Sequence, residues 1–234
     1  TKDGKLVSGI NSDGSAYGSL YTPAVVAYPD KGNAFISYSG MLTNGIINEK
    51  GLVVTGTQGQ EQLKDDVAVG LPTCSDVLYT GWKCDNAKEA KNSYIKGDWG
   101  PGHGENFICS DVSGDGYVIE HTASKDSVRS DKDYGLGDYI IATNGFLNKD
   151  MWDSLFQGDE FWDDDMPRYW TEEKIITDQK GDVNIDTIGD ALGCNSYYVD
   201  ADWYNDVWEK GEFVGYKEVK NGVWEEGVYD ISDT

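Results

Sequence analysis

The chain lacks most of the motifs that assign an enzyme class directly. Only two of its 234 residues are histidines, His103 and His121, so a histidine-dependent catalytic triad has few options. His121 closes an apolar run beside Glu120, and we predict a structural role for it. The absence of a G-x-S-x-G sequence argues against an α/β-hydrolase. The four cysteines form no C-x-x-C pair, and we expect no metal or cofactor.

Long apolar runs and basic residues are also scarce. No stretch approaches the roughly 20 apolar residues that a transmembrane helix requires, so no membrane span is expected. Asp and Glu number 42 against 19 Lys and Arg, which gives a formal charge of −23. That charge repels nucleic acid and favours neutral or cationic partners. The 38% hydrophobic and 12% aromatic content supports a packed globular fold.

The cysteines leave two alternatives open. Cys74 and Cys84 could close a short disulfide loop if the protein is exported, or they could be buried free thiols in a reducing compartment. The chain shows no signal peptide, but it also has no initiator methionine and is compatible with a leader already removed. An extracytoplasmic location is therefore slightly favoured over a cytoplasmic one.

Thr1 opens the chain, and threonine is able to act as an N-terminal nucleophile. Its free α-amino group, which titrates at about pH 7.7–8.0, can serve as the general base for its own hydroxyl. However, Lys2–Lys5 is a hairpin-turn signal preceded by Thr1 alone. We therefore expect either that another chain from the same precursor supplies the first strand, or that the sequence belongs to a longer polypeptide.

Short strands joined by tight turns, with a few helices, are the predicted elements. Strands are expected at Lys5–Ile10, Ala24–Tyr28, Ala34–Tyr38, Gly45–Ile47, Leu52–Thr57, Asn106–Asp111, Tyr117–Thr122 and Tyr139–Asn144. Helices are expected at Asp76–Thr80, Ala87–Tyr94, Tyr169–Lys180 and Ile185–Leu192, the last with Asn184 or Asp186 as its N-cap. We predict one domain over residues 1–193 and an acidic, aromatic extension over 194–234.

Two motifs have competing interpretations. Asp111–Gly116 resembles the start of a calcium loop, but the ligand expected at position twelve is Thr122, so a hairpin turn is predicted instead. Asn144 follows an apolar run, and its amide could point into a site as an oxyanion donor. The alternative is that Asn144 and Gly145 simply form a turn.

Five segments resemble, in order, motifs of the acyl-CoA:6-aminopenicillanic acid acyltransferase-like peptidases. They are the G-x-N-x-D element Gly9–Asp13, the N-E-x-G-L hairpin within Gly45–Gly56, the segment Asn106–Glu120, the strand Ala142–Phe146 and a helix led by Arg168. Each motif alone is weak, and their common order makes coincidence improbable. The sequence after residue 193 is not covered.

The resemblance implies an α+β fold of the N-terminal-nucleophile type, an αββα sandwich of two stacked antiparallel sheets. It also implies hydrolysis or acyl transfer at a small amide or peptide-like substrate, by a nucleophile that self-cleavage exposes. Asp13, with Asn11 in the same element, would orient the nucleophile and its amine. Asn144 would stabilise the tetrahedral oxyanion, and Arg168 matches an arginine of the family.

Two departures from the family pattern bear on the chemistry. The family nucleophile is usually cysteine, and the twelve residues from Thr1 to Asp13 are about one short strand fewer than the family spacing. This places the nucleophile several residues upstream of Thr1, with Thr1 itself as the alternative. Gly145 also stands where the family usually has histidine after the asparagine, which changes the pocket wall.

Two other classes of function remain open. The chain could be a catalytically inactive N-terminal-nucleophile fold that serves as a binding or assembly module, with the aromatic residues of 197–229 as a partner surface. A lectin-like β-protein is the third possibility, and it predicts no pocket that joins Asp13 to Asn144.

Overall fold

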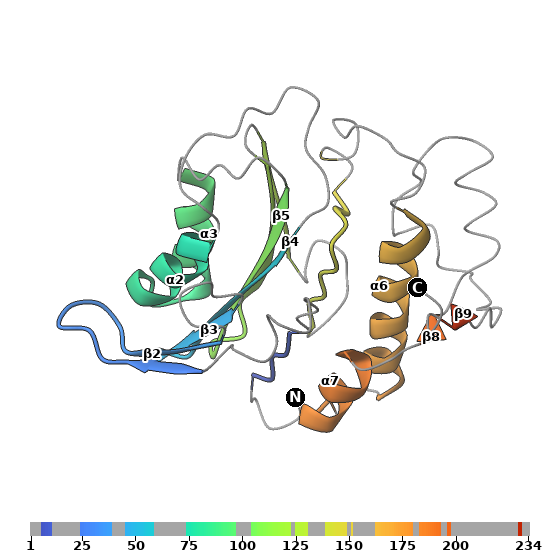
Figure 1. Ribbon diagram of the computed structural model, residues 1–234, viewed down its shortest axis with the longest axis horizontal. Helices are drawn as coiled ribbons and strands as arrows, with labels where there is room; N and C mark the ends of the chain where they lie inside the picture. Colours follow the sequence, from blue (N-terminus) through green and yellow to red (C-terminus); the bar gives the residue numbers. More distant parts are fainter. Residues whose placement is uncertain are drawn as a thin grey trace.

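The computed structural model of the chain combines helices with an antiparallel sheet (Figure 1). It describes residues 6–10, 24–38, 45–58, 74–96, 104–122, 125–130, 139–148, 151, 162–179, 183–192, 196–197 and 229–230. The predicted mixture of helices and antiparallel strands is confirmed. The described residues contain one seven-stranded sheet and one two-stranded pair, and the second stacked sheet of the predicted sandwich is not found among them.

The seven strands of the main sheet follow chain order, and each is antiparallel to its neighbour. They are β1 (Val25–Ala27), β2 (Phe35–Tyr38), β3 (Gly45–Asn48), β4 (Leu52–Gln58), β5 (Glu105–Asp111), β6 (Gly116–His121) and β7 (Asp126–Ser130). The two-stranded pair joins β8 (Ser196–Tyr197) to β9 (Tyr229–Asp230), and β8 lies against a helix, α6.

Two features of the sheet differ from the prediction. Leu6–Ile10 forms no strand, so the strand expected at Lys5–Ile10 is wrong over these residues. Strand β7 was not predicted, because its sequence Asp-Ser-Val-Arg-Ser is short and mostly polar. It is held in the sheet by its pairing with β6 and by the burial of Arg129, which is 1% exposed.

Within the described ranges, four helices accompany the sheet. They are α2 (Cys74–Lys83), α3 (Ala87–Lys96), α6 (Trp162–Asp178) and α7 (Ile185–Leu192), all near predicted positions, although α2 and α6 begin earlier than expected. Asn184 is the N-cap of α7, since its Oδ1 accepts the N–H groups of Asp186 (2.8 Å) and Thr187 (3.1 Å). Across the described parts of the chain, no helix has the length and apolar character needed to cross a membrane.

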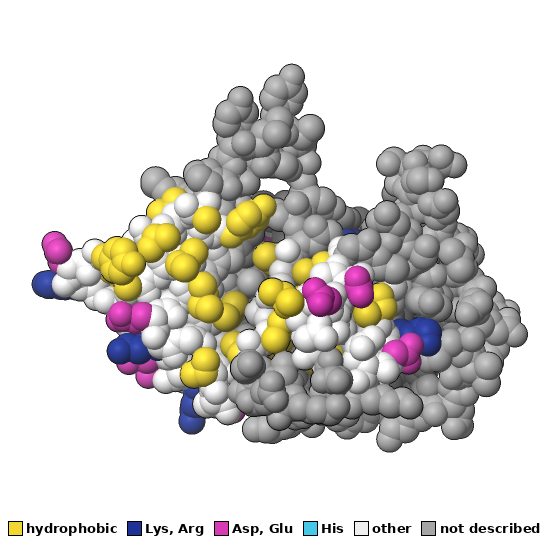
Figure 2. All heavy atoms as spheres, turned by 90° about the horizontal axis from the view of Figure 1, so that it is seen from below, with side chains coloured by type: hydrophobic (Ala, Val, Ile, Leu, Met, Phe, Trp, Pro, Cys, Tyr) yellow, Lys and Arg dark blue, Asp and Glu magenta, His cyan; other side chains and the backbone are white. Residues whose placement is uncertain are grey.

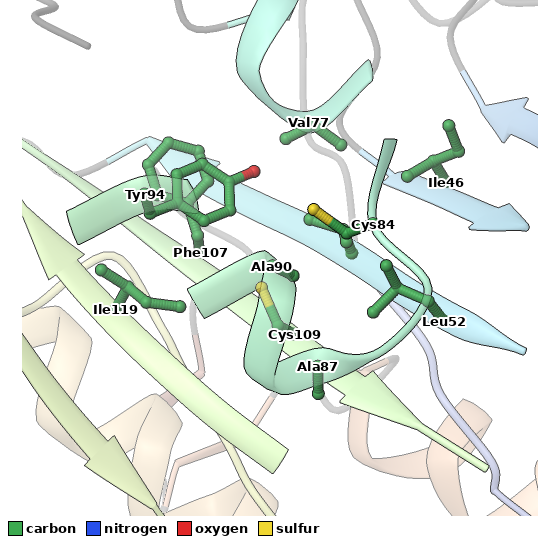
Figure 3. Close-up of a cluster of buried hydrophobic side chains, with 11 residues drawn as sticks. Ile46, Leu52, Val77, Cys84, Ala87, Ala90, Tyr94, Phe107, Cys109 and Ile119 are labelled. Atoms are coloured by element: carbon green, nitrogen blue, oxygen red, sulfur yellow. The ribbon is translucent and has the colours of Figure 1, made fainter. Parts of the chain in front are cut away.

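Helices α2 and α3 cover one face of the sheet and enclose the hydrophobic core (Figure 3). Alternate strand residues enter this core, including Ile46, Val54, Phe107 and Ile119, all at most 3% exposed. The Phe107 ring stacks on Tyr94 of α3 at 4.1 Å between centroids. The residues between these alternate positions must therefore face the other side of the sheet.

The turn between β5 and β6 also anchors α3. Oδ1 of Asp111 accepts the N–H of Ser113 over 2.7 Å, while its Oδ2 accepts the N–H of Ala87, the first residue of α3, over 2.7 Å. Gly114 completes the turn with a φ of 91°, which residues other than glycine rarely adopt. The hairpin interpretation of this motif is confirmed.

The cysteines are free wherever their side chains are described. Cys84 and Cys109 are both buried free thiols, and burial raises the pKa of Cys84 to about 11. Cys74 begins α2 and Cys84 follows its end, so about ten residues of helix, or ~15 Å, separate their backbones. A disulfide spans at most about 7 Å between Cα atoms. The proposed Cys74–Cys84 bridge is therefore wrong, and the free-thiol alternative is correct for Cys84.

Candidate functional site

Two residues predicted for the site, Asn144 and Arg168, contact each other. Nη1 of Arg168, on α6, donates a hydrogen bond to Oδ1 of Asn144 over 3.2 Å. The two residues are 24 positions apart in the sequence, and the hydrogen bond is partly buried. The other three predicted residues, Thr1, Asn11 and Asp13, lie outside the described residues.

Asn144 lies in segment 139–148, which runs between the sheet and α6 (Figure 1). The segment pairs with no strand among the described residues, so the strand predicted at Tyr139–Asn144 is wrong. Side chains of the sheet and of α6 satisfy several of its polar groups instead of a ladder of backbone hydrogen bonds. The position of Asn144 is thus set by residues distant in the sequence.

Asn106, on β5, holds the carbonyl groups of the two residues on either side of Asn144. Its Nδ2 donates to the carbonyl oxygen of Thr143 over 2.8 Å and to that of Gly145 over 2.9 Å. Thr57, directly opposite Asn106 on β4, donates through Oγ1 to the same Thr143 oxygen over 3.0 Å. Both side chains stand on the face of the sheet that points away from α2 and α3.

Glu120, the cross-strand partner of Asn106 on β6, holds the end of the segment. Its two carboxylate oxygens accept the N–H groups of Leu147 (2.7 Å) and Asn148 (3.0 Å). Nε of Arg129, on β7, donates to Glu120 Oε1 over 3.1 Å, and both side chains are at most 1% exposed. Burial raises the pKa of Glu120, while the charge of Arg129 and the two N–H donors oppose that rise.

On the opposite side, α6 contributes two acidic residues to the site. The hydroxyl of Tyr139 donates to Oε1 of Glu173 over 3.1 Å. Burial raises the pKa of Glu173 to about 7, although the hydrogen bond from Tyr139 lowers it. Burial likewise raises the pKa of Glu172 to about 7 against the opposing charge of Arg168. Both carboxyl groups therefore have a pKa near neutral, Glu172 within the influence of the Arg168 charge and Glu173 bound by Tyr139.

These two raised pKa values predict that the fold loses stability as pH rises from 5 to 8. A carboxyl whose pKa is higher in the folded state than its ordinary 4.5 stabilises the fold fully below pH 4.5, and that contribution is lost as pH passes through about 7. For the pair we expect a loss of about 1–3 kcal/mol in the free energy of unfolding, measured by urea denaturation.

The double variant Glu172→Gln/Glu173→Gln isolates this contribution from the general repulsion of an acidic chain. We expect it to be more stable than the wild type at pH 8 and to have a flatter dependence on pH. Gln at position 173 keeps an acceptor for the Tyr139 hydroxyl, so the variant retains this hydrogen bond. Its change in stability then reports the loss of the two titrating groups. Parallel pH profiles of the wild type and the variant would contradict the assignment.

Segment 6–10 lies on the same face of the sheet as Asn144. Cγ2 of Ile10 comes 3.8 Å from the β-carbon position of Gly45, which faces away from α2 and α3. On its other side the segment touches α7, where a β-carbon at Gly9 would come within 2.5 Å of Ile188. A larger residue at position 9 would therefore displace side chains of α7. Segment 6–10 therefore lies between β3 and α7, on the face of the sheet that carries Asn144.

The sequence did not identify the residues that fix segment 139–148. Asn106 and Glu120 are the two ends of a family motif, but the motif predicted no role for them. No motif in the sequence indicated a role in the site for Thr57 or Arg129. For Thr57, Asn106 and Glu120 the available signal was polarity, because they are polar side chains on strands that otherwise supply the core. Their contact partners lie 9 to 86 residues away in the sequence, beyond any local pattern.

The contacts of His121 agree with the structural role predicted for it. It is 3% exposed, its Nδ1 contacts the Asp126 carboxylate across the β6–β7 pair, and its ring lies 6.1 Å from that of Phe107. His103 lies outside the described residues. Within the described ranges, no three His, Cys, Asp or Glu side chains are grouped so that they could hold a metal ion.

No protein-family model matches the chain, and neither does any curated protein. Among solved structures, penicillin V acylase from Agrobacterium tumefaciens is similar over 67% of this chain, with 14% identity and a TM-score of 0.38. Two variants of conjugated bile acid hydrolase from Clostridium perfringens are similar over 67% and 72% of the chain, with 16% and 15% identity and TM-scores of 0.42 and 0.43.

The chain spans 46% of the length of the acylase structure and 63% and 65% of the hydrolase structures. All three TM-scores lie below 0.5 and all identities below 25%. The contacts within this chain must therefore carry any functional proposal.

Proposed function

We propose that the protein is an N-terminal-nucleophile amidohydrolase or acyltransferase that acts on a small amide or peptide-like substrate. The observation that carries the proposal is the hydrogen bond from Arg168 to Asn144, on the face of the sheet where segment 6–10 lies. Two residues expected to share a site from their motifs alone thus lie in direct contact. Asp13 and Asn11 follow segment 6–10 and complete the proposed site.

The contact with Arg168 defines what the Asn144 amide can offer to a substrate. Its Oδ1 accepts from the guanidinium, which orients the amide group, and the donors of this amide are its two Nδ2 protons. A donor fixed before the reaction stabilises the oxyanion that forms when a nucleophile attacks a carbonyl. Arg168 also supplies a positive charge beside the developing negative one.

The remaining steps are assigned to residues outside the described part of the chain. The nucleophile, activated by its own α-amino group, attacks the substrate carbonyl, and the amine leaves with a proton to give an acyl-enzyme. Water or an acceptor amine then takes the acyl group. Asp13 orients the nucleophile and its amine, and Asn11 supports the same turn. The nucleophile is Thr1 or a residue that precedes it.

The proposal includes the αββα sandwich as its fold. Val26, Ile36 and Ile47 are direct cross-strand neighbours on β1–β3, and they are 55%, 49% and 46% exposed on the face away from α2 and α3. Figure 2 shows hydrophobic side chains gathered on part of the molecular surface seen from below. An apolar row of this kind suits the packing of a second sheet.

The same apolar row favours the second candidate function, a catalytically inactive fold that serves as a binding or assembly module. In that case the row on β1–β3 contacts a partner protein, and the Asn144–Arg168 pair has no reaction to support. The two functions differ in whether the native protein forms an acyl-enzyme.

The proposed function is tested on the native protein purified from its source. N-terminal sequencing and intact mass identify the nucleophile as a free Thr1 or as a free Cys, Ser or Thr before it. The protein is then incubated with N-acetyl-, N-hexanoyl- and N-phenylacetyl-4-nitroanilide and with penicillin V, and amine release is followed. Amine release together with a transient acyl adduct supports the enzyme. Neither signal with any of these amides favours the binding module.

We expect Arg168→Gln to lower kcat for the cleaved amide about tenfold with little change in KM. The variant loses the guanidinium, which fixes Asn144 and places a positive charge nearby. Both effects act mainly on the developing oxyanion. Lys174→Gln, on the same helix and engaged with the exposed Asp178, is the matched control. Equal kcat values for the two variants would remove Arg168 from the proposed site.

A further inference from the structure

We propose that Asn106 is a positioning residue that sets the direction of the Asn144 amide without touching the substrate. The inference rests on the proposed function for its chemistry, but its geometry stands on this chain alone. Asn106 is fully buried, and its single amide group donates to the carbonyls of residues 143 and 145, at 2.8 and 2.9 Å. These carbonyls belong to the residues before and after Asn144 in the sequence.

Two bonds from one amide group constrain the loop more than two separate contacts do. The Thr143 carbonyl belongs to the peptide unit before Asn144, and the Gly145 carbonyl belongs to the peptide unit after Gly145. Their shared donor therefore fixes the backbone at both ends of the Asn144-Gly145 pair. Asn106 itself sits on a strand paired on both sides, with β4 and with β6. A rigid element thus determines where the Asn144 side chain begins.

The neighbouring contacts hold other parts of segment 139–148. Thr57 reinforces the bond to Thr143, and Glu120 holds the N–H groups of Leu147 and Asn148 further along. Among the described residues, only Asn106 is seen to contact the carbonyls of both Thr143 and Gly145. Loss of the Asn106 donors should therefore shift Asn144 while leaving the downstream anchor at Glu120 in place.

The variant Asn106→Asp tests this with almost no change in volume. It replaces the NH₂ group by an oxygen, and above its pKa the new carboxylate faces two carbonyl oxygens with no proton to offer. When protonated, the carboxyl regains one donor. Burial and the two carbonyls raise its pKa, so the defect should be strong at pH 8 and partly reversed at pH 5.5.

The first measurement needs no substrate. Hydrogen exchange of the segment 139–148, expressed as protection factors, should fall at least tenfold at pH 8 in the variant and recover toward the wild type at pH 5.5. Phe107→Leu is the control, because Phe107 is the next residue on β5 but packs into the core on the other face. It should lower protection in α3 and leave segment 139–148 unchanged at both values of pH.

The second measurement is kcat for whichever 4-nitroanilide the wild type cleaves. Asn106→Asp should lower kcat about ten- to a hundredfold at pH 8, with KM nearly constant, because a displacement near 1 Å suffices for such a loss. The loss should shrink at pH 5.5 relative to the wild type at the same pH. The Phe107→Leu control should show no such pH-dependent recovery.

The two measurements distinguish a failure of the positioning role from a failure of the proposed function. Unchanged protection of segment 139–148 in Asn106→Asp overturns the positioning role, whatever the activity. Loss of protection across the whole sheet at both pH values, as from general destabilisation, overturns it as well. If the segment responds as expected but the wild type cleaves no amide, the proposed function fails and the structural role of Asn106 stands.

Discussion

Replacing Asn144 with alanine is expected to lower kcat for amide cleavage by about 10²–10³-fold. That is the usual cost of removing one donor of an oxyanion hole, and it reflects about 2.7–4 kcal/mol of transition-state stabilisation. KM should change much less, because the donor contributes mainly when negative charge develops on the carbonyl oxygen. Steady-state kinetics with the cleaved 4-nitroanilide measures both constants.

Asn148→Ala is the matched control for this variant. It removes the same type of side chain from the same segment, but the Asn148 contact to Glu120 uses the backbone N–H, which alanine retains. Equal losses in Asn144→Ala and Asn148→Ala would show that the segment tolerates neither change. A loss below fivefold in Asn144→Ala would remove Asn144 as an oxyanion donor.

Replacing Arg129 with methionine is expected to lower the free energy of unfolding by about 3–5 kcal/mol at pH 8. The change leaves the Glu120 carboxylate buried without its charged partner, and breaking a buried pair from one side is strongly destabilising. Methionine keeps much of the volume beneath the Tyr169 ring, whose centre lies 6.0 Å from the guanidinium carbon. Packing loss should therefore be the smaller part of the effect.

The loss in Arg129→Met should depend on pH in a defined direction. Without Arg129, burial raises the pKa of Glu120 further, so the folded state favours its protonated form. The stability of the variant is then retained below about pH 4.5 and lost as pH rises through the folded pKa. Urea denaturation at pH 5 and pH 8 measures the difference between variant and wild type at each pH.

The exposed pair on α6 is the control for Arg129→Met. Lys174 and Asp178 interact over 3.1 Å, but their side chains are 27% and 62% exposed. Lys174→Met should cost less than about 1 kcal/mol because water screens such a pair. Similar losses in the two variants, or a loss in Arg129→Met that does not vary with pH, would contradict the importance assigned to the buried pair.

The spacing of apolar residues along the sequence predicted those strands and helices that bury one face in the core. Strands β4 to β6 and helix α3 have apolar residues at the spacing of their own element, and their turns contain glycines such as Gly114. Strand β7 escaped prediction because only Val128 in it is apolar. Its central role comes from Arg129, whose partner Glu120 lies on the preceding strand.

Segment 139–148 shows why part of the site could not be predicted. Its apolar residues are typical of a strand, and a strand was predicted for Tyr139–Asn144. Asn106 and Glu120 instead bind its backbone, and those contacts join positions 27 to 39 residues apart. Asn144 and Arg168 were assigned to one site only through a family resemblance, since spacing alone favoured a simple Asn-Gly turn at Asn144.

The alternation of β5 and β6 makes both strands intolerant of insertions and deletions. Phe107 and Ile119 face the core, while Asn106 and Glu120, paired directly beside them, face the site. Deleting one residue early in either strand would turn its core-facing residues toward the site and its site-facing residues toward the core. A polar side chain would then enter the core, and segment 139–148 would lose the contact that holds it. Insertions and deletions among relatives of this protein should therefore be confined to the loops. The number of residues in β5 and β6 should stay constant even where most of the side chains differ.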